Sequence, residues 1–167
     1  GGAFSVWQDY REGSIGLYAQ HIDVMGNPSM SLDGEKIFYG IDYNGQLYNY
    51  EDPLQLTPKS LYLGDDQTLL YWEDYRNGNQ DVEGVSLSTS YVYGEIIDLD
   101  YGNMGTNNGI TLSSSPVQTK PSVKPYESGY LYHFIGQNIS SGEDILKFEK
   151  LSDNFTAINN ESSSVDG

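Results

Sequence analysis

The sequence predicts an all-β fold, from its composition and from two signals along the chain. Its 167 residues include 15 Tyr, 19 Gly and 6 Pro, which fits strands joined by many turns. The heptapeptide WQDYREG at 7–13 returns as WEDYRNG at 72–78. Asn44-Gly45 separates two aromatic-rich segments, and this dipeptide favours the backbone of a tight hairpin. No segment has a convincing amphipathic helical pattern, so we expect strands throughout.

The heptapeptides mark an internal repeat of about 60–65 residues. We expect repeat 1 at 1–54 without its leading strand, repeat 2 at 55–117 with an insertion near 86–95, and a degenerate repeat 3 at 118–167. The alignment pairs Pro58-Lys59-Ser60 with Pro121-Ser122-Val123, Leu69–Trp72 with Leu131–Phe134, and Asp33-Gly34 with Asn108-Gly109. Since the chain starts and stops inside a repeat, we expect it to be a piece of a longer repetitive protein.

Each repeat is expected to form a small antiparallel sheet. The first strands are Ala3–Trp7, Thr68–Trp72 and Tyr130–Phe134, and the strands after the polar turn are Ile15–Ile22, Asp81–Leu87 and Asp144–Leu151. Further strands are expected at Lys36–Tyr43, Gln46–Tyr50, Tyr91–Leu99 and Ile110–Leu112. A sheet of three or four strands per repeat is most simply one propeller blade, which needs a neighbour to cover it. The prediction is therefore about two and a half β-propeller-like blades, part of a larger propeller.

Charge and cysteine content exclude several classes of function. There are 8 basic and 24 acidic residues, a net charge of −16, so the surface repels nucleic acid and anionic lipid. The absence of Cys rules out disulfides, thiolate zinc sites and Cys-held iron–sulfur clusters. The sequence has no run of about 18 apolar residues, so it predicts no membrane-spanning helix. We expect no nucleic-acid partner and no membrane insertion.

Residues 1–27 carry a Gly-Gly-Ala lead, an apolar strand, a Trp-x-Asp-x-Arg-x-Gly motif, Tyr-Ala-Gln and a Gly-Asn turn. This pattern resembles a repeat common in large secreted or surface proteins of bacteria, many of them Bacteroidetes-type cargo of type IX secretion. Gly16 stands where that family usually has Asp, and Met30 or Met104 where it often has Trp. The resemblance implies a β-propeller-like fold and a secreted or cell-surface location, and it indicates little about activity.

Ten residues are expected to hold the repeats together rather than to form a ligand site. They are Trp7, Asp9, Arg11, Gly13, Trp72, Asp74, Arg76, Gly78, Asp81 and Asp144. A repeated ligand clamp is the alternative, because Arg binds carboxylates in a fork. Copies at equivalent positions favour the structural role, in which Asp caps the turn and Arg ties it to a strand, since a catalytic site needs different residues that converge.

No catalytic or cofactor residues are predicted, and two alternatives stay open. Calcium could use acidic turns whose candidate ligands are Asp42, Asn44, Asp65, Asp66, Asp98, Asp100 and Asn103, although none forms an EF-hand loop. A glycosidase needs two carboxylates across a cleft, and 24 acidic residues make a pair uninformative. The two histidines, His21 and His133, accompany no Gly-x-Ser-x-Gly elbow.

The expected function is therefore non-enzymatic. We expect a structural, adhesive or binding module of a secreted or surface β-repeat protein, possible cargo of a secretion system, and the alternative is part of a propeller-type polysaccharide hydrolase. Its partners would be further blades, other protein chains or glycans. A cluster of tyrosines at Tyr39, Tyr43, Tyr48 and Tyr50 could offer an aromatic surface for glycans or self-association, or be ordinary strand composition.

Overall fold

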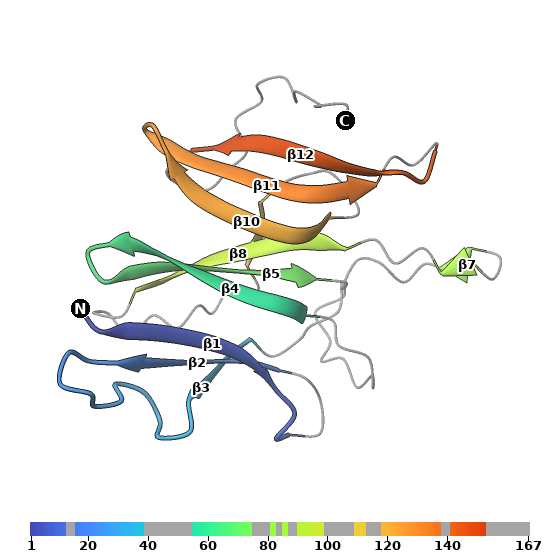
Figure 1. Ribbon diagram of the computed structural model, residues 1–167. Helices are drawn as coiled ribbons and strands as arrows, with labels where there is room; N and C mark the ends of the chain where they lie inside the picture. The colour runs from blue at the N-terminus through green and yellow to red at the C-terminus, as the bar shows by residue number, and fades with distance from the viewer. Residues whose placement is uncertain are drawn as a thin grey trace. The chain divides into compact units, whose positions relative to one another are not determined.

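In the described part of the chain every regular element is a β-strand and none is a helix, which confirms the all-β prediction (Figure 1). The computed structural model describes residues 1–12, 16–38, 55–74, 81–82, 85–86, 90–98, 109–112, 118–137 and 141–152. Its strands are β1 Ala3–Asp9, β2 Gly16–Ile22, β3 Glu35–Phe38, β4 Gln55–Gly64, β5 Gln67–Asp74, β6 Asp81–Val82, β7 Val85–Ser86, β8 Tyr91–Asp98, β9 Ile110–Thr111, β10 Gln118–Tyr126, β11 Gly129–Gln137 and β12 Asp144–Leu151. The expected hairpin around Asn44-Gly45 and the four clustered tyrosines lie outside the described residues.

The strands form three antiparallel sheets and one short hairpin. The sheet orders are β1-β2-β3, β4-β5-β8-β9 and β10-β11-β12, while β6 pairs with β7. The strands of each sheet fall inside one of the three expected repeats. The repeat boundaries, the blade arrangement and the larger propeller remain predictions. The chain divides into two compact units, 1–72 with 94–109 and 73–93 with 110–167, so the division passes through β5 and β8.

The second sheet corrects one expected strand. The strand that pairs with β5 is β8, whereas the expected strand Asp81–Leu87 is divided between β6 and β7, which pair with each other. The reason is burial. β8 supplies Val92 and Ile97, which are 0% and 1% exposed, so it completes the core of this sheet. The repeat alignment has no gap between the two copies at this point, so it selects the nearer segment.

The first sheet has two chemically distinct faces. In the β1–β2 register Trp7 lies opposite Tyr18, and Phe4 lies opposite His21. Because side chains alternate along a strand, Trp7 and Tyr18 share one face, while Phe4 shares the other with Leu17, which is fully buried. Strand β4 packs against β1 and β2 within the first unit.

The leading strands β4 and β10 share a backbone irregularity. Thr57 and Lys120 have positive φ values of 50° and 51°, and each precedes a proline, Pro58 or Pro121. In β10 the pairing with β11 shifts register between Thr119 and Ser122, as at a β-bulge. The same irregularity at equivalent positions agrees with the alignment of these two proline segments.

The buried core is dominated by large apolar side chains from the middle strands. Trp72 is 1% exposed, and Tyr132 and Phe134 are 0% exposed. Tyr132 and Phe134 stack with ring centroids 4.8 Å apart. Phe134 thus fills in the third sheet the position that Trp72 fills in the second.

Replacing the buried indole tests its contribution to stability. We expect Trp72→Ala to lower the free energy of unfolding by about 3–5 kcal/mol, because it removes a large buried side chain and leaves a cavity. Urea unfolding measures the change. The control Tyr10→Ala removes an aromatic ring that is 57% exposed and should change stability by about 0.5 kcal/mol or less. Equal effects of the two substitutions would show that Trp72 is not a packing residue.

Candidate functional site

Asp9 and Arg11 form a closed clamp with Trp7 at the end of β1. The backbone N–H of Arg11 donates to Asp9 Oδ1 at 2.9 Å, and its Nε donates to Oδ2 at 2.9 Å. The terminal guanidinium nitrogen also donates to Oδ2, and Trp7 Nε1 donates to the same oxygen at 3.2 Å. These bonds, led by those from Arg11, hold the pKa of Asp9 well below its usual range.

The guanidinium of Arg11 is occupied on its flat side as well. Its Cζ lies 4.3 Å from the centroid of the Tyr18 ring, which is cation–π geometry. Tyr18 in turn stacks on Trp7 at 6.4 Å between centroids. The edge of the Arg11 guanidinium therefore binds Asp9, and its plane packs on Tyr18, which is the arrangement expected for a structural role.

The two tryptophans make the same contact with a glycine. A methyl group added to Gly34 would meet Trp7 Cζ2 at 2.6 Å and the Ala19 carbonyl oxygen at 3.0 Å. A methyl group on Gly109 would meet Trp72 Cη2 at 2.8 Å and the Gly94 carbonyl oxygen at 3.1 Å. Both glycines have positive φ, 82° and 66°. The sequence aligned these two glycines, and the structure places them under equivalent indoles.

The remaining motif residues are distributed as follows. Asp74 is buried at the end of β5, and Asp144 is exposed at the start of β12, opposite Gln137. Asp81 lies in β6, and nothing further is described of its side chain. Gly13, Arg76 and Gly78 lie outside the described residues. The structure therefore describes the full Trp-Asp-Arg clamp for the first repeat.

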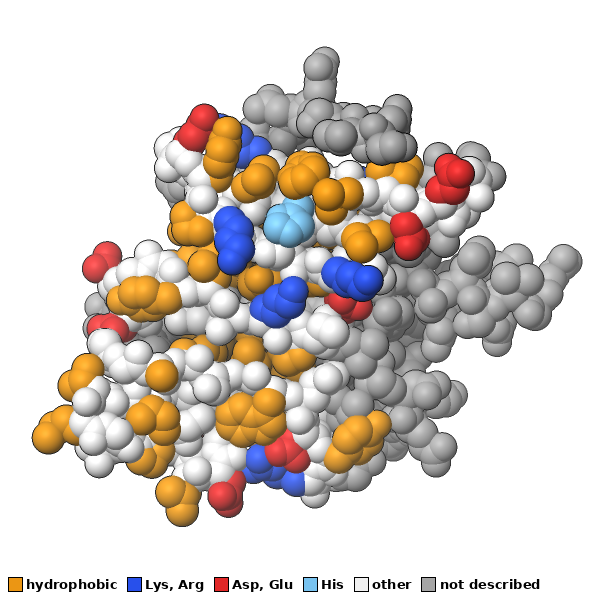
Figure 2. Space-filling model, viewed as in Figure 1, with side chains coloured by type: hydrophobic (Ala, Val, Ile, Leu, Met, Phe, Trp, Pro, Cys, Tyr) orange, Lys and Arg blue, Asp and Glu red, His pale blue; other side chains and the backbone are white. Residues whose placement is uncertain are grey.

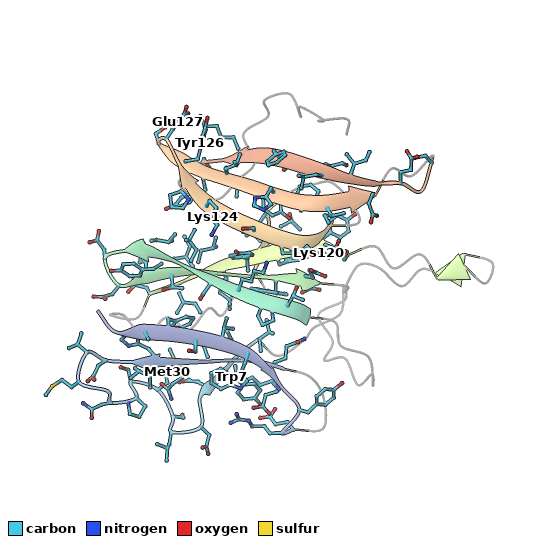
Figure 3. The ribbon with its side chains drawn as sticks, viewed as in Figure 1. Trp7, Met30, Lys120, Lys124, Tyr126 and Glu127 are labelled. Carbon is cyan, nitrogen blue, oxygen red and sulfur yellow. The ribbon has the colours of Figure 1, made fainter. Side chains whose placement is uncertain are left out.

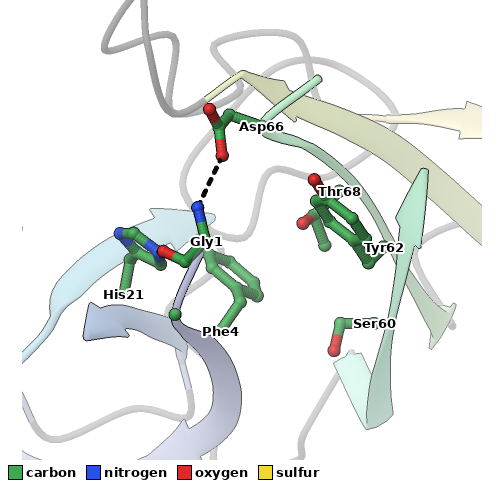
Figure 4. Close-up of a pocket in the computed structure, with 8 residues that line it drawn as sticks. Gly1, Phe4, His21, Ser60, Tyr62, Asp66 and Thr68 are labelled. Carbon is green, nitrogen blue, oxygen red and sulfur yellow. Dashed lines mark hydrogen bonds and ion pairs between the residues drawn. The ribbon is translucent and has the colours of Figure 1, made fainter. Parts of the chain in front are cut away.

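A pocket of about 210 Å³ lies within the first unit, between β1–β2 and β4–β5 (Figure 4). Phe4 and Tyr62 give it aromatic walls, and its polar lining comes from His21, Ser60, Asp66 and Thr68. Asp66 Oδ1 lies 3.3 Å from the amine of Gly1. Asp66 is the single carboxylate among the lining residues, so this pocket does not contain the carboxylate pair of a glycosidase.

His21 in this pocket has a fixed orientation but no catalytic arrangement. Its Nδ1 lies 3.0 Å from Ser29 Oγ, and its Nε2 lies 3.2 Å from the carbonyl oxygen of Gly1. Nucleophilic catalysis by a Ser–His pair needs a third group that orients the imidazole. Here the carbonyl oxygen of Gly1 takes that position, so the contact links His21 of β2 to the segment before β1.

The carboxylates of Asp23 and Asp98 accept hydrogen bonds from within the chain. Asp23 accepts from the backbone N–H groups of Met25 and Asn27, each at 2.8 Å, and from the Asn27 amide at 3.1 Å. These bonds, led by those from Asn27, lower the pKa of Asp23. Asp98 accepts from Gln67 Nε2 at 3.2 Å.

The calcium prediction stays untested. The described residues contain no group of three or more acidic or histidine side chains placed to hold a metal ion. Four of the candidate ligands, Asp42, Asn44, Asp100 and Asn103, lie outside those residues. The two candidates Asp65 and Asp66 form the β4–β5 turn with positive φ values of 47° and 55°.

A further feature, which the sequence did not predict, is a partly exposed sheet face. We call the side of each sheet that bears Trp7, Trp72 or Phe134 its Trp face, and the opposite side, which bears Leu17, Val92 or Leu146, its Leu face. The Leu face of the third sheet carries Lys124, Leu131, His133, Ile135, Leu146, Phe148 and Lys150. Figure 2 shows hydrophobic, lysine and histidine side chains gathered over β10–β12, and Figure 3 labels Lys124 and Tyr126 there.

Equivalent positions show how unusual this face is. In the pairing registers Leu17 lies opposite Gln8, and Leu146 lies opposite Ile135, which is the same place in the two sheets. Val92 corresponds to Leu17, because Gly94 and Ala19 make the same contact with their glycines. Leu17 and Val92 are 0% exposed, whereas Leu146 is 45% exposed. The run Leu131-Tyr132-His133-Phe134-Ile135 suits burial on both faces, so the sequence does not indicate that one of them is exposed.

Comparison with known proteins adds no assignment. No family model, curated protein or solved structure matches the chain. Within the part of the chain that the structure describes, no helix is long and apolar enough to cross a membrane.

The indole–glycine contact predicts an unequal response of two glycines to the same substitution. Gly34→Ala should lower the free energy of unfolding by about 2–4 kcal/mol, since it combines positive φ with a clash against Trp7. Gly26→Ala is the matched control, because Gly26 has φ 89° and nothing within 4 Å of an added methyl group. It should lose only the backbone part, about 1–2 kcal/mol. Thermal or urea unfolding measures both, and equal losses would contradict the contact.

The clamp predicts a pH-dependent contribution of Asp9. Its pKa is lower in the folded chain than the value of about 3.9 expected when unfolded. Asp9 therefore stabilises the fold above about pH 4, and this contribution is lost as the pH falls further. Asp9→Asn should be less stable than the native chain at neutral pH, with a difference that shrinks below about pH 4. Urea unfolding over a pH series checks this, and a difference independent of pH would rule out the charged clamp.

Proposed function

We propose that this chain is a non-enzymatic module of a secreted or cell-surface bacterial β-repeat protein, which acts by structural, adhesive or other binding contacts. Its working surfaces are the faces of its sheets. The observation that carries the proposal is the use of the repeated motif. Asp9 binds both Arg11 and Trp7, and Gly34 packs against the Trp7 indole. The described contacts of the motif are therefore contacts within the fold.

Two further observations support a binding role without chemistry. The pocket in the first unit offers one carboxylate and a histidine held by Ser29 and a backbone oxygen. The Leu face of the third sheet, by contrast, offers a half-exposed apolar surface with lysines on an otherwise acidic chain. An exposed apolar patch of this kind is typical of a protein-binding surface.

The location rests on sequence features. The resemblance of residues 1–27 to repeats of exported proteins supports export. The net charge of −16 without any Cys is compatible with a protein that works outside the cell. Type IX secretion is the route that the resemblance implies.

The experiment that tests the proposal separates binding from turnover. The chain is incubated with soluble polysaccharides of several linkage types, and newly formed reducing ends are measured against heat-denatured protein. We expect no release above that control, because the described pocket lacks a carboxylate pair. Release of reducing ends by the native chain that Asp66→Asn abolishes would overturn the proposal and establish the hydrolase instead. Protease treatment of intact producing cells tests the location, and we expect the protein to be cleaved.

A further inference from the structure

Two aromatic rings stand on opposite sides of the pocket in the first unit. Phe4 of β1 is half-buried, and Tyr62 of β4 is 63% exposed. Figure 4 shows Phe4 on one side of the pocket and Tyr62 on the other. Aromatic walls with a few polar groups between them are typical of small-molecule sites, because each ring offers a flat apolar surface to a ligand.

Hydroxyl groups without a partner in the chain line the same pocket. Thr68 of β5 is 2% exposed, and no hydrogen bond with a described residue occupies its hydroxyl. The same holds for Ser60, which alternates with Tyr62 along β4 and therefore shares its face. A buried hydroxyl is normally hydrogen-bonded, and it can both donate and accept. The Thr68 hydroxyl is thus suited to bind a hydroxyl of a ligand.

Asp66 adds an acceptor in the turn between β4 and β5. Its side chain is 37% exposed, and its Oδ1 lies 3.3 Å from the nitrogen of Gly1. Among the described residues, none donates to its Oδ2, so this oxygen can accept from a ligand hydroxyl. A peptide bond before Gly1 would keep an N–H group on the same nitrogen, so the acceptor role of Asp66 does not require a free amine.

His21 gives the pocket a fixed wall. Its ring nitrogens lie 3.0 Å from Ser29 Oγ and 3.2 Å from the carbonyl oxygen of Gly1. Gly2 permits this close approach, because a methyl group added there would lie 3.0 Å from His21 Nε2 and would clash with the carbonyl oxygen of Ile22. A wall that is already in place lowers the entropy lost on binding.

Size and charge narrow the class of ligand. The volume of about 210 Å³ is below the roughly 300–1,000 Å³ of pockets for drug-sized ligands, so it suits a single ring. Among the described lining residues none is Lys or Arg, and the chain carries −16. A carboxylate, sulfate or phosphate on the ligand would therefore be repelled. A neutral ring with an apolar face and several hydroxyls fits the pocket best.

We propose that this pocket binds one pyranose unit of a neutral glycan. The inference rests on the proposed function, of which it names the ligand class. The apolar face of the sugar ring packs against Tyr62 and Phe4, while the sugar hydroxyls bond to Thr68, Ser60 and Asp66. With a single carboxylate in its lining, the pocket holds the sugar without cleaving it.

An NMR titration of the whole isotope-labelled chain tests the proposal. The probes are the methyl glycosides of glucose, galactose, mannose and N-acetylglucosamine, added one at a time. We expect at least one of them to shift the amide signals of Phe4, Tyr62 and Thr68. The dissociation constant should be on the order of 1 mM, because a ligand of one ring has few atoms. The methyl glycoside of glucuronic acid should bind at least about tenfold more weakly than the best neutral probe.

Two substitutions separate ring packing from hydrogen bonding. Tyr62→Ala should weaken binding at least about tenfold, because it removes the exposed aromatic wall. Thr68→Val keeps the shape of the side chain and removes its hydroxyl, so it should weaken binding about threefold to tenfold. The matched control is Tyr126→Ala, since Tyr126 is a strand tyrosine of β10 that is 47% exposed and does not line the pocket. It should bind like the native chain, and melting curves check that all variants fold.

Several results would contradict the site. A chain that responds to none of the four neutral glycosides at about 50 mM has no such site. Binding of choline without binding of sugars would show instead a site for cations, which aromatic rings and a carboxylate also suit. Affinity that survives Tyr62→Ala, or equal affinity for the neutral and charged glycosides, also overturns the proposal. None of these results changes the release of reducing ends in the hydrolysis assay, so failure of this inference and failure of the proposed function are distinguishable.

Discussion

The contact of an indole ring with a glycine is the constraint that the first and second sheets of this chain share. Trp7 packs against Gly34, and Trp72 packs against Gly109. A backbone carbonyl oxygen, of Ala19 or Gly94, also lies close to each glycine. A side chain at either glycine would clash with the ring and would have to accept a left-handed backbone. The contact joins Trp7 of β1 to Gly34, just before β3, and Trp72 of β5 to Gly109, just before β9.

The sequence predicted the strands that carry the indoles and the two glycines, and it did not predict all of the strand pairing. The class of fold, the strands around Trp7, Trp72 and Phe134, and the equivalence of Gly34 and Gly109 all follow from local patterns and from repetition. The pairing of β5 with β8 did not, because the alignment counted residues from Trp72 and could not see that Val92 was needed in the core. Strands β6 and β7 pair with each other, so they take no backbone hydrogen-bonding partner from the second sheet.

The partial exposure of the Leu face of the third sheet could not be predicted from the sequence for a different reason. Leu17 and Leu146 are the same residue type at equivalent strand positions, and their exposure differs because of what lies against them. Periodicity reports which side chains share a face, and it carries no information about the neighbour of that face. The candidate site residues of the motif illustrate the converse. Repetition marked Asp9 and Arg11 correctly as a pair, while their contacts with Trp7 and Tyr18 required the register of β1 with β2.

The Trp face and the Leu face of the sheets differ in how closely their residues are repeated. The Trp face carries the residues that close the unit, so Trp7 and Trp72 are constrained by their own sheet. The Leu face varies more in composition: Gln8, Glu73 and Ile135 occupy one equivalent position with three different chemistries. A bulged leading strand needs an acceptor there, as Lys120 finds in Glu73. Ile135 offers no such acceptor, so the Leu face of the third sheet cannot repeat the contact that Glu73 makes with a bulged N–H group.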